Sequence, residues 1–405
     1  MLDWLIVGGG IHGTLLSRVL VEEVGIAADR VRVLDPHDEP LWRFRRCAAA
    51  TGLDYLRSSV VHHLDADPMA LRRFAETRRR RDELHGIYQR PGLELFTTHC
   101  DHVIERAGLR ALRLRGEALE IGRRRSALRV ETSAGELAAR HVALALGPSD
   151  QPLRPAWAEE LRASGAPVRH VFEEEFRLDE ALASSHSIIL GGGLSAVQVA
   201  LWLAARRPGA VTLLSRHPVR VHEFDSDSHW MGPRGARGFA SLAGRGERRA
   251  LIGRERHRGS VPAELARALA RHVGRGSIAW VEGEVETAAP DRLAEGGAAA
   301  REGKSPAAPG LELVLRSGRR LRGDRLLLAT GFDPRRPGGA FMDRTIERLG
   351  LEYAACGYPA VDASLRWAPG LYVTGPLAEL EIGPVARNIL GARLAGQRLA
   401  AAAGT

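Results

Sequence analysis

Two glycine-rich segments carry the residues whose spacing most directly indicates chemistry. Each segment follows an apolar strand and opens a helix. Their small residues are Gly8, Gly10 and Gly13 in the first segment, and Gly191, Gly193, Ser195 and Ala196 in the second. Glycines at this spacing let a backbone approach a pyrophosphate, which rests on a helix N-terminus where amide groups and the helix dipole favour negative charge. The two segments therefore predict two dinucleotide sites in one chain.

The strands that follow these segments end in opposite charges. The first ends at Asp35, and the second ends at Ser215 followed by Arg216. A carboxylate at this place accepts hydrogen bonds from a ribose 2′-hydroxyl, whereas an arginine suits a 2′-phosphate. The pattern predicts FAD at the first site and NADPH at the second. If Arg216 is instead one of many surface arginines, NADH remains an alternative.

The order of these units predicts an α/β fold with two Rossmann-like, three-layer dinucleotide-binding domains. Residues 1–165 and 325–405 form the expected FAD-binding domain, and the NAD(P)H-binding domain, residues 166–324, is inserted into it. Within the insert, the Gly/Arg-rich residues 231–260 are expected to form a long surface excursion or mobile loop. The low-complexity residues 288–310 are expected to form a hairpin insertion or a disordered loop.

Four further residues are predicted to contact the FAD. Gly147 breaks a strand sharply, and Gly375 ends the last strand of the chain. A helix that opens near Pro384 has proline at a permitted first-turn position, and its N-terminus would face the flavin pyrimidine edge. The alternative is that this helix merely closes the domain. Trp42 is expected either to stack near the flavin or to be an ordinary core aromatic residue.

The neighbouring histidines His62 and His63 are candidates for general acid–base catalysis. The simpler alternative is an exposed pair on a loop. A metal site needs several convergent ligands, and no third ligand at a characteristic spacing accompanies the pair, so no metal site is expected there or elsewhere in the chain. A Gly-x-Ser-x-Gly elbow is also absent from the sequence.

Several short stretches resemble a known family. Residues 328–332, Leu-Ala-Thr-Gly-Phe, and residues 370–375, Gly-Leu-Tyr-Val-Thr-Gly, resemble the two-dinucleotide-binding flavoproteins. Among these the chain is most similar to the flavin-containing and the amino-acid N-hydroxylating (ornithine/lysine) monooxygenases, whose chain-crossing segment residues 144–149 resemble. Residues 55–64 resemble the segment near flavin and substrate in the N-hydroxylases, where Arg57 stands in place of a lysine, which makes Arg57 a third catalytic candidate.

This resemblance implies an FAD-dependent, NADPH-using monooxygenase. Such an enzyme uses O2 to hydroxylate a nucleophilic nitrogen or sulfur of a small molecule through a flavin hydroperoxide. An alternative is an NAD(P)H-dependent flavin or quinone reductase that oxygenates nothing. The three cysteines, Cys47, Cys100 and Cys356, are far apart in sequence, which excludes only the disulfide-reductase version of that alternative.

The composition bounds the remaining possibilities. The chain has 405 residues, of which 44% are hydrophobic and 26% charged, as in soluble globular proteins. The net charge of +9 suggests a third alternative, a nucleotide-sensing or RNA-associated flavoprotein. However, Lys304 is the only lysine among 58 basic residues, which indicates a coding bias, so no nucleic-acid partner is expected.

Neither a secretion signal nor an apolar run of roughly 18–20 residues is visible, so a cytoplasmic protein without a membrane partner is expected. The sequence is compatible with a homo-oligomer and does not identify the substrate.

Overall fold

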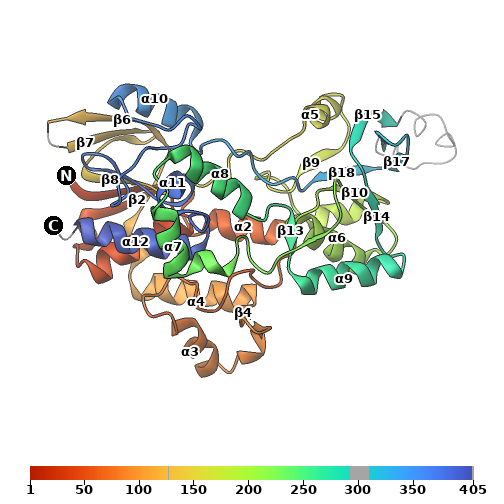
Figure 1. The fold of residues 1–405 in the computed structure, drawn as a ribbon, viewed down its shortest axis with the longest axis horizontal. Coiled ribbons are helices and arrows are strands. Elements are labelled where there is room, and N and C mark those ends of the chain that lie inside the picture. The colour runs from red at the N-terminus through yellow and green to blue at the C-terminus, as the bar shows by residue number, and fades with distance from the viewer. Residues whose placement is uncertain (126, 292–309, 404–405) are drawn as a thin grey trace.

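The computed structural model describes residues 1–125, 127–291 and 310–403 of the chain. Two largely parallel sheets lie next to each other, one in each half of the molecule (Figure 1). Helices pack on both sheets: α1 (Ile11–Arg18) lies on the first with α12 (Ile389–Ala403) packed against it, and α6 (Leu194–Arg206) lies on the second with α9 (Ala263–Gly274) packed against it. The expected α/β class with two Rossmann-type units is confirmed.

The first sheet contains the N-terminal strand in its centre. Its strand order is β19-β20-β8-β1-β2-β5, and an antiparallel ribbon of β6 and β7 extends from β8. The strands are β1 (Leu2–Val7), β2 (Val31–Asp35), β5 (Arg113–Arg115), β6 (Ala118–Arg124), β7 (Ala127–Thr132), β8 (Gly135–Leu144), β19 (Arg366–Ala368) and β20 (Leu371–Val373). The central strands are apolar and buried, because helices cover a parallel sheet on both faces.

The second sheet is parallel throughout, with the order β14-β11-β10-β18-β9. Its strands are β9 (Val168–His170), β10 (Ser187–Leu190), β11 (Val211–Ser215), β14 (Ala279–Glu282) and β18 (Arg325–Leu328). The predicted domain boundary at residue 325 is therefore wrong. Strand β18 pairs with β10, with Leu328 opposite Leu190, so the chain completes the second sheet before it returns to the first.

The strand registers bring the predicted site residues to the carboxyl ends of the two sheets. Val7 of β1 lies opposite Leu34 and Leu144. In the second sheet, Leu190 lies opposite Leu214 and Leu328. Since ligands of open parallel sheets bind outside the carboxyl ends of the strands, both glycine-rich segments are placed where a dinucleotide would bind.

The Gly/Arg-rich residues 231–260 are not a loose loop. They form α7 (Pro233–Ala240) and α8 (Arg245–Glu255), which pack on α11 (Glu379–Ile382). Phe239 and Ile252 from these helices form a small buried core with Tyr358 and Leu380. The composition suggested a mobile loop because glycine and arginine are abundant in this segment and only a few apolar residues, such as Phe239 and Ile252, form its core.

The other predicted irregular segment is partly a hairpin. Strand β15 (Val285–Asp291) pairs antiparallel with β16 (Gly310–Leu315), and β16 pairs with β17 (Arg320–Gly323). The prediction for residues 292–309 lies outside the described residues. The remaining elements are α2 (Trp42–Thr51), α3 (Ala70–Thr77), α4 (Leu93–Arg106), α5 (Ala156–Ala163), α10 (Gly339–Leu349), β3 (Leu84–His85), β4 (Arg90–Pro91), β12 (Arg220–Val221) and β13 (Ser260–Val261), besides short 3-10 and π-helical turns.

The last helix begins later than predicted. Pro384 lies in a turn between α11 and α12, and the final helix starts at Ile389. The Asn388 side chain caps it by accepting the Gly391 amide at 3.0 Å, and asparagine is among the best N-cap residues. The prediction placed the start of the helix at Pro384, because proline is permitted in a first turn. It missed Asn388, the N-cap residue four positions later. Within the described ranges, every helix is too short or too polar to cross a bilayer.

Candidate functional site

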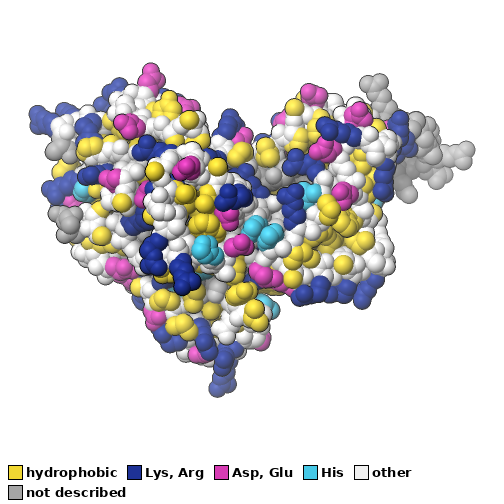
Figure 2. Space-filling view, viewed as in Figure 1, with side chains coloured by type: hydrophobic (Ala, Val, Ile, Leu, Met, Phe, Trp, Pro, Cys, Tyr) yellow, Lys and Arg dark blue, Asp and Glu magenta, His cyan; other side chains and the backbone are white. Residues whose placement is uncertain are grey.

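One cavity of about 2010 Å³ lies between the two sheets, and both glycine-rich segments line it. Figure 2 shows the hollow between the two lobes, with arginine or lysine side chains around it. Pockets that hold one small ligand have volumes of up to about 1,000 Å³. The volume of this cavity is about twice that. The cavity is large enough for two such ligands.

The first glycine-rich segment forms a tight turn against the sheet. Gly8 has φ +106°, and a Cβ atom added there would lie 2.6 Å from the Ala145 carbonyl oxygen. A Cβ atom at Gly13 would overlap the carbonyl oxygen of Gly8. Gly10 lines the cavity, and a Cβ atom there would meet nothing within 4 Å. Gly8 and Gly13 therefore make the turn, while Gly10 leaves space at the N-terminus of α1 for a ligand.

Asp35 lies at the cavity wall beside this turn. One carboxylate oxygen accepts the Gly9 amide at 2.6 Å, and the other accepts the His37 amide at 2.9 Å. Arg113 pairs with the same carboxylate at 3.4 Å. A carboxylate has about four lone-pair sites, so Asp35 can order the turn and still accept a ligand hydroxyl.

The second glycine-rich segment repeats this arrangement on the second sheet. Gly191 has φ +151°, and a Cβ atom there would lie 2.5 Å from the Ala329 carbonyl oxygen. A Cβ atom at Gly193 would lie 3.1 Å from the Cα of Gly259. Ser195 lines the cavity, whereas Ala196 is fully buried behind it. Gly191 and Gly193 thus form the turn, and Ser195 and Ala196 lie in the first turn of α6, which follows it.

Arg216 lies exposed at the cavity wall, directly after β11. Its guanidinium group makes no hydrogen bond or ion pair to any described residue, and neither do the guanidinium groups of Arg220 and Arg258, which also line the cavity. Such unpaired guanidinium groups suit phosphate, because their planar fork binds phosphate oxygens in pairs.

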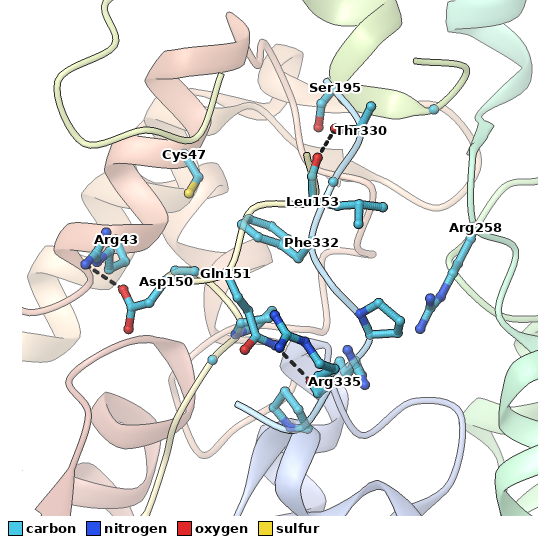
Figure 3. Close-up of a pocket in the computed structure, with 18 of the residues that line it drawn as sticks. Arg43, Cys47, Asp150, Gln151, Leu153, Ser195, Arg258, Thr330, Phe332 and Arg335 are labelled. Carbon is cyan, nitrogen blue, oxygen red and sulfur yellow. Dashed lines mark hydrogen bonds and ion pairs between the residues drawn. The ribbon is translucent and has the colours of Figure 1, made fainter. Parts of the chain in front are cut away.

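Two crossing segments, residues 145–151 and 329–336, line the middle of the cavity. Gln151 donates to the Arg335 carbonyl at 2.8 Å, and Thr330 donates to the Leu153 carbonyl (Figure 3). Phe332 lies in the centre of this view and stacks on Phe172, with ring centroids 4.7 Å apart. Gly147 lines the cavity as predicted. These contacts fasten the two domains to each other beside the cavity.

A buried charge cluster forms another part of the wall. Glu379 is 1% exposed and pairs with Arg249 and with Arg387, which lies 2.7 Å away. Arg256 and Arg387 line the cavity, and Arg387 also donates to the Tyr358 hydroxyl at 2.8 Å. Arginines outnumber the carboxylate here, so the wall presents positive charge to the cavity.

Four of the residues predicted to bind FAD do not line the cavity: Gly13, which is buried inside the turn, and Trp42, Gly375 and Pro384. Trp42 lies behind His37, on which it stacks with ring centroids 3.6 Å apart, and it is His37 that reaches the wall. Gly375 has φ +66° and lies against the His12 ring, and the next residue, Pro376, is at the wall. The Pro384 carbonyl accepts a hydrogen bond from Arg256 at 3.1 Å, without lining the cavity.

Arg57 also lies away from the cavity. Its guanidinium donates to the carbonyls of His222 and Phe224, at 2.6 and 2.7 Å, and pairs with Asp225 at 2.9 Å. The guanidinium N–H groups that make these contacts all point to residues of the inserted domain. Arg57 is therefore a clamp between segments and not a catalytic residue in this cavity.

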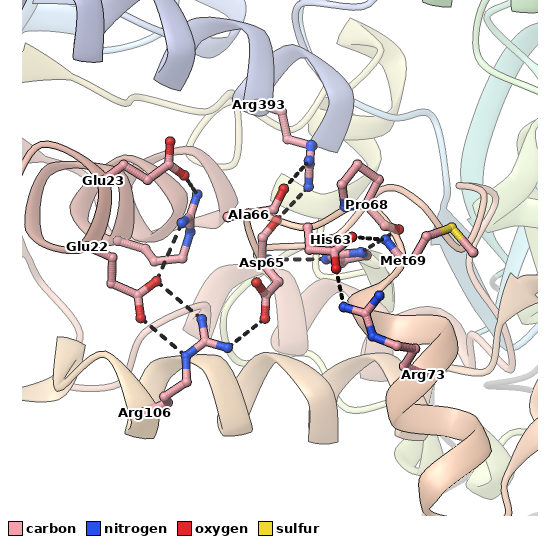
Figure 4. Close-up of polar contacts among 12 residues, drawn as sticks. Glu22, Glu23, His63, Asp65, Ala66, Pro68, Met69, Arg73, Arg106 and Arg393 are labelled. Carbon is pink, nitrogen blue, oxygen red and sulfur yellow. Dashed lines mark hydrogen bonds and ion pairs between the residues drawn. The ribbon is translucent and has the colours of Figure 1, made fainter.

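His62 and His63 are buried in the lobe of α3 and α4, which contradicts the expectation of an exposed loop pair. The His63 ring accepts the Asp65 amide at 3.1 Å and contacts the Pro68 carbonyl at 3.1 Å (Figure 4). Neither histidine lines the large cavity. The sequence did not indicate this burial because their segment has no regular apolar period.

Burial keeps several histidines neutral and makes stability depend on pH. Desolvation lowers the pKa to about 4 for His12, His62 and His63, and to about 3 for His99 and His170. In the unfolded chain these histidines bind protons near pH 6.5. The free energy of unfolding therefore decreases as pH falls from about 6.5 toward about 4, because only the unfolded state is protonated in that range.

We expect the free energy of unfolding, measured in urea, to fall steeply between about pH 7 and about pH 5, by up to roughly 1.4 kcal/mol per pH unit for each histidine, and the urea midpoint to fall with it. His99→Leu removes one of these titrations and should reduce the slope. Equal midpoints at both pH values would contradict this account.

The sequence reasoning missed His12, which lies inside the first glycine-rich segment and lines the cavity. Its Nδ1 lies 2.9 Å from the Thr374 hydroxyl, so it joins the turn to the end of β20. Its Nε2 is covered and has no hydrogen-bond partner within the described residues. The position of His12 between Gly10 and Gly13 could have indicated from the sequence that it lies at the cavity.

Two cysteines, Cys47 and Cys356, line the cavity, and the Cys47 thiol is not a reactive thiolate. Burial raises the pKa of Cys47 to about 11, so the side chain is neutral near pH 7. Neither Cys47, Cys100 nor Cys356 forms a disulfide. This chemistry does not favour thiol–disulfide exchange through Cys47.

Comparison with known proteins agrees with this geometry. A protein-family model described as FAD-NAD(P)-binding matches residues 5–149, which include the first glycine-rich segment and Asp35. No curated protein matches the chain by sequence.

Three solved structures share the fold over nearly the whole chain. The ornithine N-hydroxylase of Kutzneria sp. 744 has a TM-score of 0.74 at 16% identity, covering 100% of this chain and 99% of its own. The cadaverine monooxygenase of Erwinia amylovora has a TM-score of 0.73 at 15% identity, covering 98% and 93%. The L-lysine 6-monooxygenase of Pseudomonas syringae has a TM-score of 0.70 at 17% identity, covering 100% and 99%. At these identities the likeness confirms the resemblance at the level of the fold.

Proposed function

We propose that this chain is an FAD- and NADPH-dependent monooxygenase that hydroxylates a nucleophilic nitrogen or sulfur atom of a small molecule. The observation that carries the proposal is the single cavity onto which both glycine-rich segments open. In this proposal the domain built on the first sheet holds FAD, and the inserted domain built on the second sheet holds NADPH. Both dinucleotides would then meet inside one polypeptide.

The first turn fits FAD. The open space at Gly10 and the N-terminus of α1 suit a pyrophosphate, because nothing blocks an approach to the backbone amides. Asp35 would accept a ribose hydroxyl while it holds the Gly9 amide. Gly147 and Pro376 would border the flavin end of the molecule, since both line the middle of the cavity.

The second turn fits NADPH. Gly193 and Ser195 would border the pyrophosphate, and Arg216 would bind the 2′-phosphate. We expect Arg216→Ala to raise the KM for NADPH by at least about tenfold, because one charge-assisted contact is worth roughly 1.5–3 kcal/mol. The KM for NADH should stay within about twofold, since NADH carries no 2′-phosphate. Steady-state oxidation of both nucleotides measures this.

Arg275→Ala is the matched control, because Arg275 is an exposed arginine of the same domain that does not line the cavity. It should leave both KM values unchanged. Equal losses for NADPH and NADH in Arg216→Ala would show that Arg216 does not recognise the 2′-phosphate.

The arrangement explains how oxidation chemistry would proceed without an acid–base pair. When bound, the flavin supplies hydride acceptance and oxygen activation. The chain must then orient the nicotinamide and exclude bulk water from the cavity. Phe332, which stacks on Phe172, forms an apolar part of the cavity wall, and the positive wall at Arg256 and Arg387 favours anionic groups there.

The names of the structural neighbours support an amine as the substrate. Ornithine, lysine and cadaverine each offer a primary amine, and a neutral amine nitrogen is a nucleophile of the required kind. We therefore propose an amine as the first substrate class, ahead of a thioether. A cytoplasmic location, where NADPH is available, completes the proposal.

Product analysis tests this function. Flavin-loaded protein is supplied with NADPH, heavy-isotope oxygen and a panel of amines, amino acids and thioethers, and the products are analysed by mass spectrometry. The proposal predicts a product that has gained one labelled oxygen atom. NADPH consumption that yields only hydrogen peroxide or a reduced quinone, with every panel compound, would instead support the reductase alternative.

A further inference from the structure

Among the described residues, one group of side chains brings three metal-ligating atoms together outside the residues that line the cavity. The group consists of His222, Asp227 and His257, whose ligand atoms all lie within 4.8 Å of one another. The two imidazole rings stack with centroids 3.6 Å apart and an interplanar angle of 14°. Nε2 of His257 lies 2.9 Å from a carboxylate oxygen of Asp227.

Backbone pairing holds the two segments that carry these residues. Strand β12 pairs with β13, and the His222 amide donates to the Val261 carbonyl at 3.0 Å. The His257 amide donates to the Asp225 carbonyl at 2.8 Å, beside an isolated bridge between Ser226 and Arg256. The backbone therefore fixes the distance between the ligands before any ion binds.

The Arg57 side chain holds the segments that carry His222 and His257 together. Besides the carbonyls of residues 222–224, its guanidinium donates to the Ser260 hydroxyl at 2.9 Å. Ser260 in turn donates to the His257 carbonyl at 2.6 Å. The Arg57 side chain is 9% exposed, so it is a rigid link between the His222 and His257 segments.

The ion pair between His257 and Asp227 does not explain why the His222 side chain also lies in this group. The contact of His257 with Asp227 explains two of the three side chains, but the His222 ring has no hydrogen-bond partner in the part of the chain that the structure describes. Asp227 is 62% exposed, so solvent reaches the group. Two imidazoles and one carboxylate are typical ligands of Zn²⁺ and related first-row ions, and water completes the shell where protein supplies three ligands.

We propose that His222, Asp227 and His257 form a binding site for a divalent first-row transition-metal ion. Histidine side chains lie in the middle of the face in Figure 2, in the region where Figure 1 labels β13. The neighbours of His257 in sequence, Arg256 and Arg258, line the dinucleotide cavity. A bound ion would fasten residues 222–227 to residue 257 and thereby steady this part of the cavity wall. The inference does not depend on the proposed function.

Zinc titration tests the site. Untagged, flavin-loaded protein is stripped with a chelator and titrated with Zn²⁺ in competition with a chromogenic chelator. We expect one ion per chain, and we expect His222→Ala and His257→Ala each to weaken binding by at least about tenfold. Asp227→Asn keeps the shape of the side chain and should weaken binding in the same direction. Arg57→Met, which removes only the supporting contacts, should cause a smaller loss.

His85→Ala is the matched control, because His85 is an exposed histidine outside the group, and it should bind Zn²⁺ like the wild type. Unfolding midpoints measured without metal establish that each variant is folded. Cobalt provides a second readout, since Co²⁺ at a site with histidine ligands gives visible absorption that the two histidine variants should lose. Absence of zinc binding in the wild type, or equal affinity in the wild type and the two histidine variants, would overturn the proposal.

Discussion

Gly10→Val is expected to give a folded protein that has lost its flavin. Gly10 has φ −74°, which valine adopts, and a Cβ atom there meets nothing within 4 Å of the chain itself. The added side chain would occupy the space in front of the α1 N-terminus where we propose that the pyrophosphate lies. We expect FAD affinity to fall by at least about 100-fold, which corresponds to roughly 2.7 kcal/mol. The ratio of flavin absorbance to protein after purification measures this.

Gly253→Val is the matched control. Gly253 is an exposed glycine of α8 with nothing within 4 Å of an added Cβ atom, and it does not line the cavity. This variant should retain full flavin content, and with the flavin removed both variants should unfold at midpoints close to that of the flavin-free wild type. A Gly10→Val protein that carries a full complement of FAD would contradict the proposed binding mode.

Glu379→Gln is expected to lower the free energy of unfolding by roughly 3–5 kcal/mol, because it leaves buried positive charge without its partner. The carboxylate is 1% exposed and pairs with Arg249 and Arg387, which are 26% and 13% exposed. Urea unfolding of the flavin-free protein measures the loss without a contribution from ligand binding.

Asp38→Asn is the comparison for an exposed pair. Asp38 and Arg115 lie 3.2 Å apart and are 68% and 72% exposed, so their loss should change stability by less than about 1 kcal/mol. Equal effects of the two substitutions would show that the Glu379 cluster is solvated, and that it does not set the charge of the cavity wall.

The parts of the site that depend on local geometry were predictable from the sequence. Gly8, Gly13 and Gly191 stand where a side chain would collide with a carbonyl oxygen, so only glycine allows the turn. Asp35 and Arg216 were also predicted to reach the site, because Asp35 ends a strand and Arg216 directly follows one, and the carboxyl ends of both strands face the cavity. Such features need no knowledge of distant contacts.

Features that depend on pairing between distant segments were not predictable. The strand Arg325–Leu328 was assigned to the wrong sheet because its apolar sequence fits either one, and only its pairing with β10 decides. The cluster at Glu379 joins three separate segments, and the group at His222 forms only when residue 257 folds back beside it. Trp42 was predicted to contact the ligand from its residue type, but its stacking on His37 turns it away from the wall.

The most direct test of the account is anaerobic reduction of the purified, flavin-loaded protein by NADPH. If both nucleotides bind in the one cavity, the visible flavin absorption band should bleach rapidly on mixing with NADPH, and more slowly with the same concentration of NADH, because Arg216 offers NADH no phosphate contact. A band that NADPH leaves unchanged, in a protein whose flavin dithionite still reduces, would contradict the claim that the two glycine-rich segments serve one electron transfer.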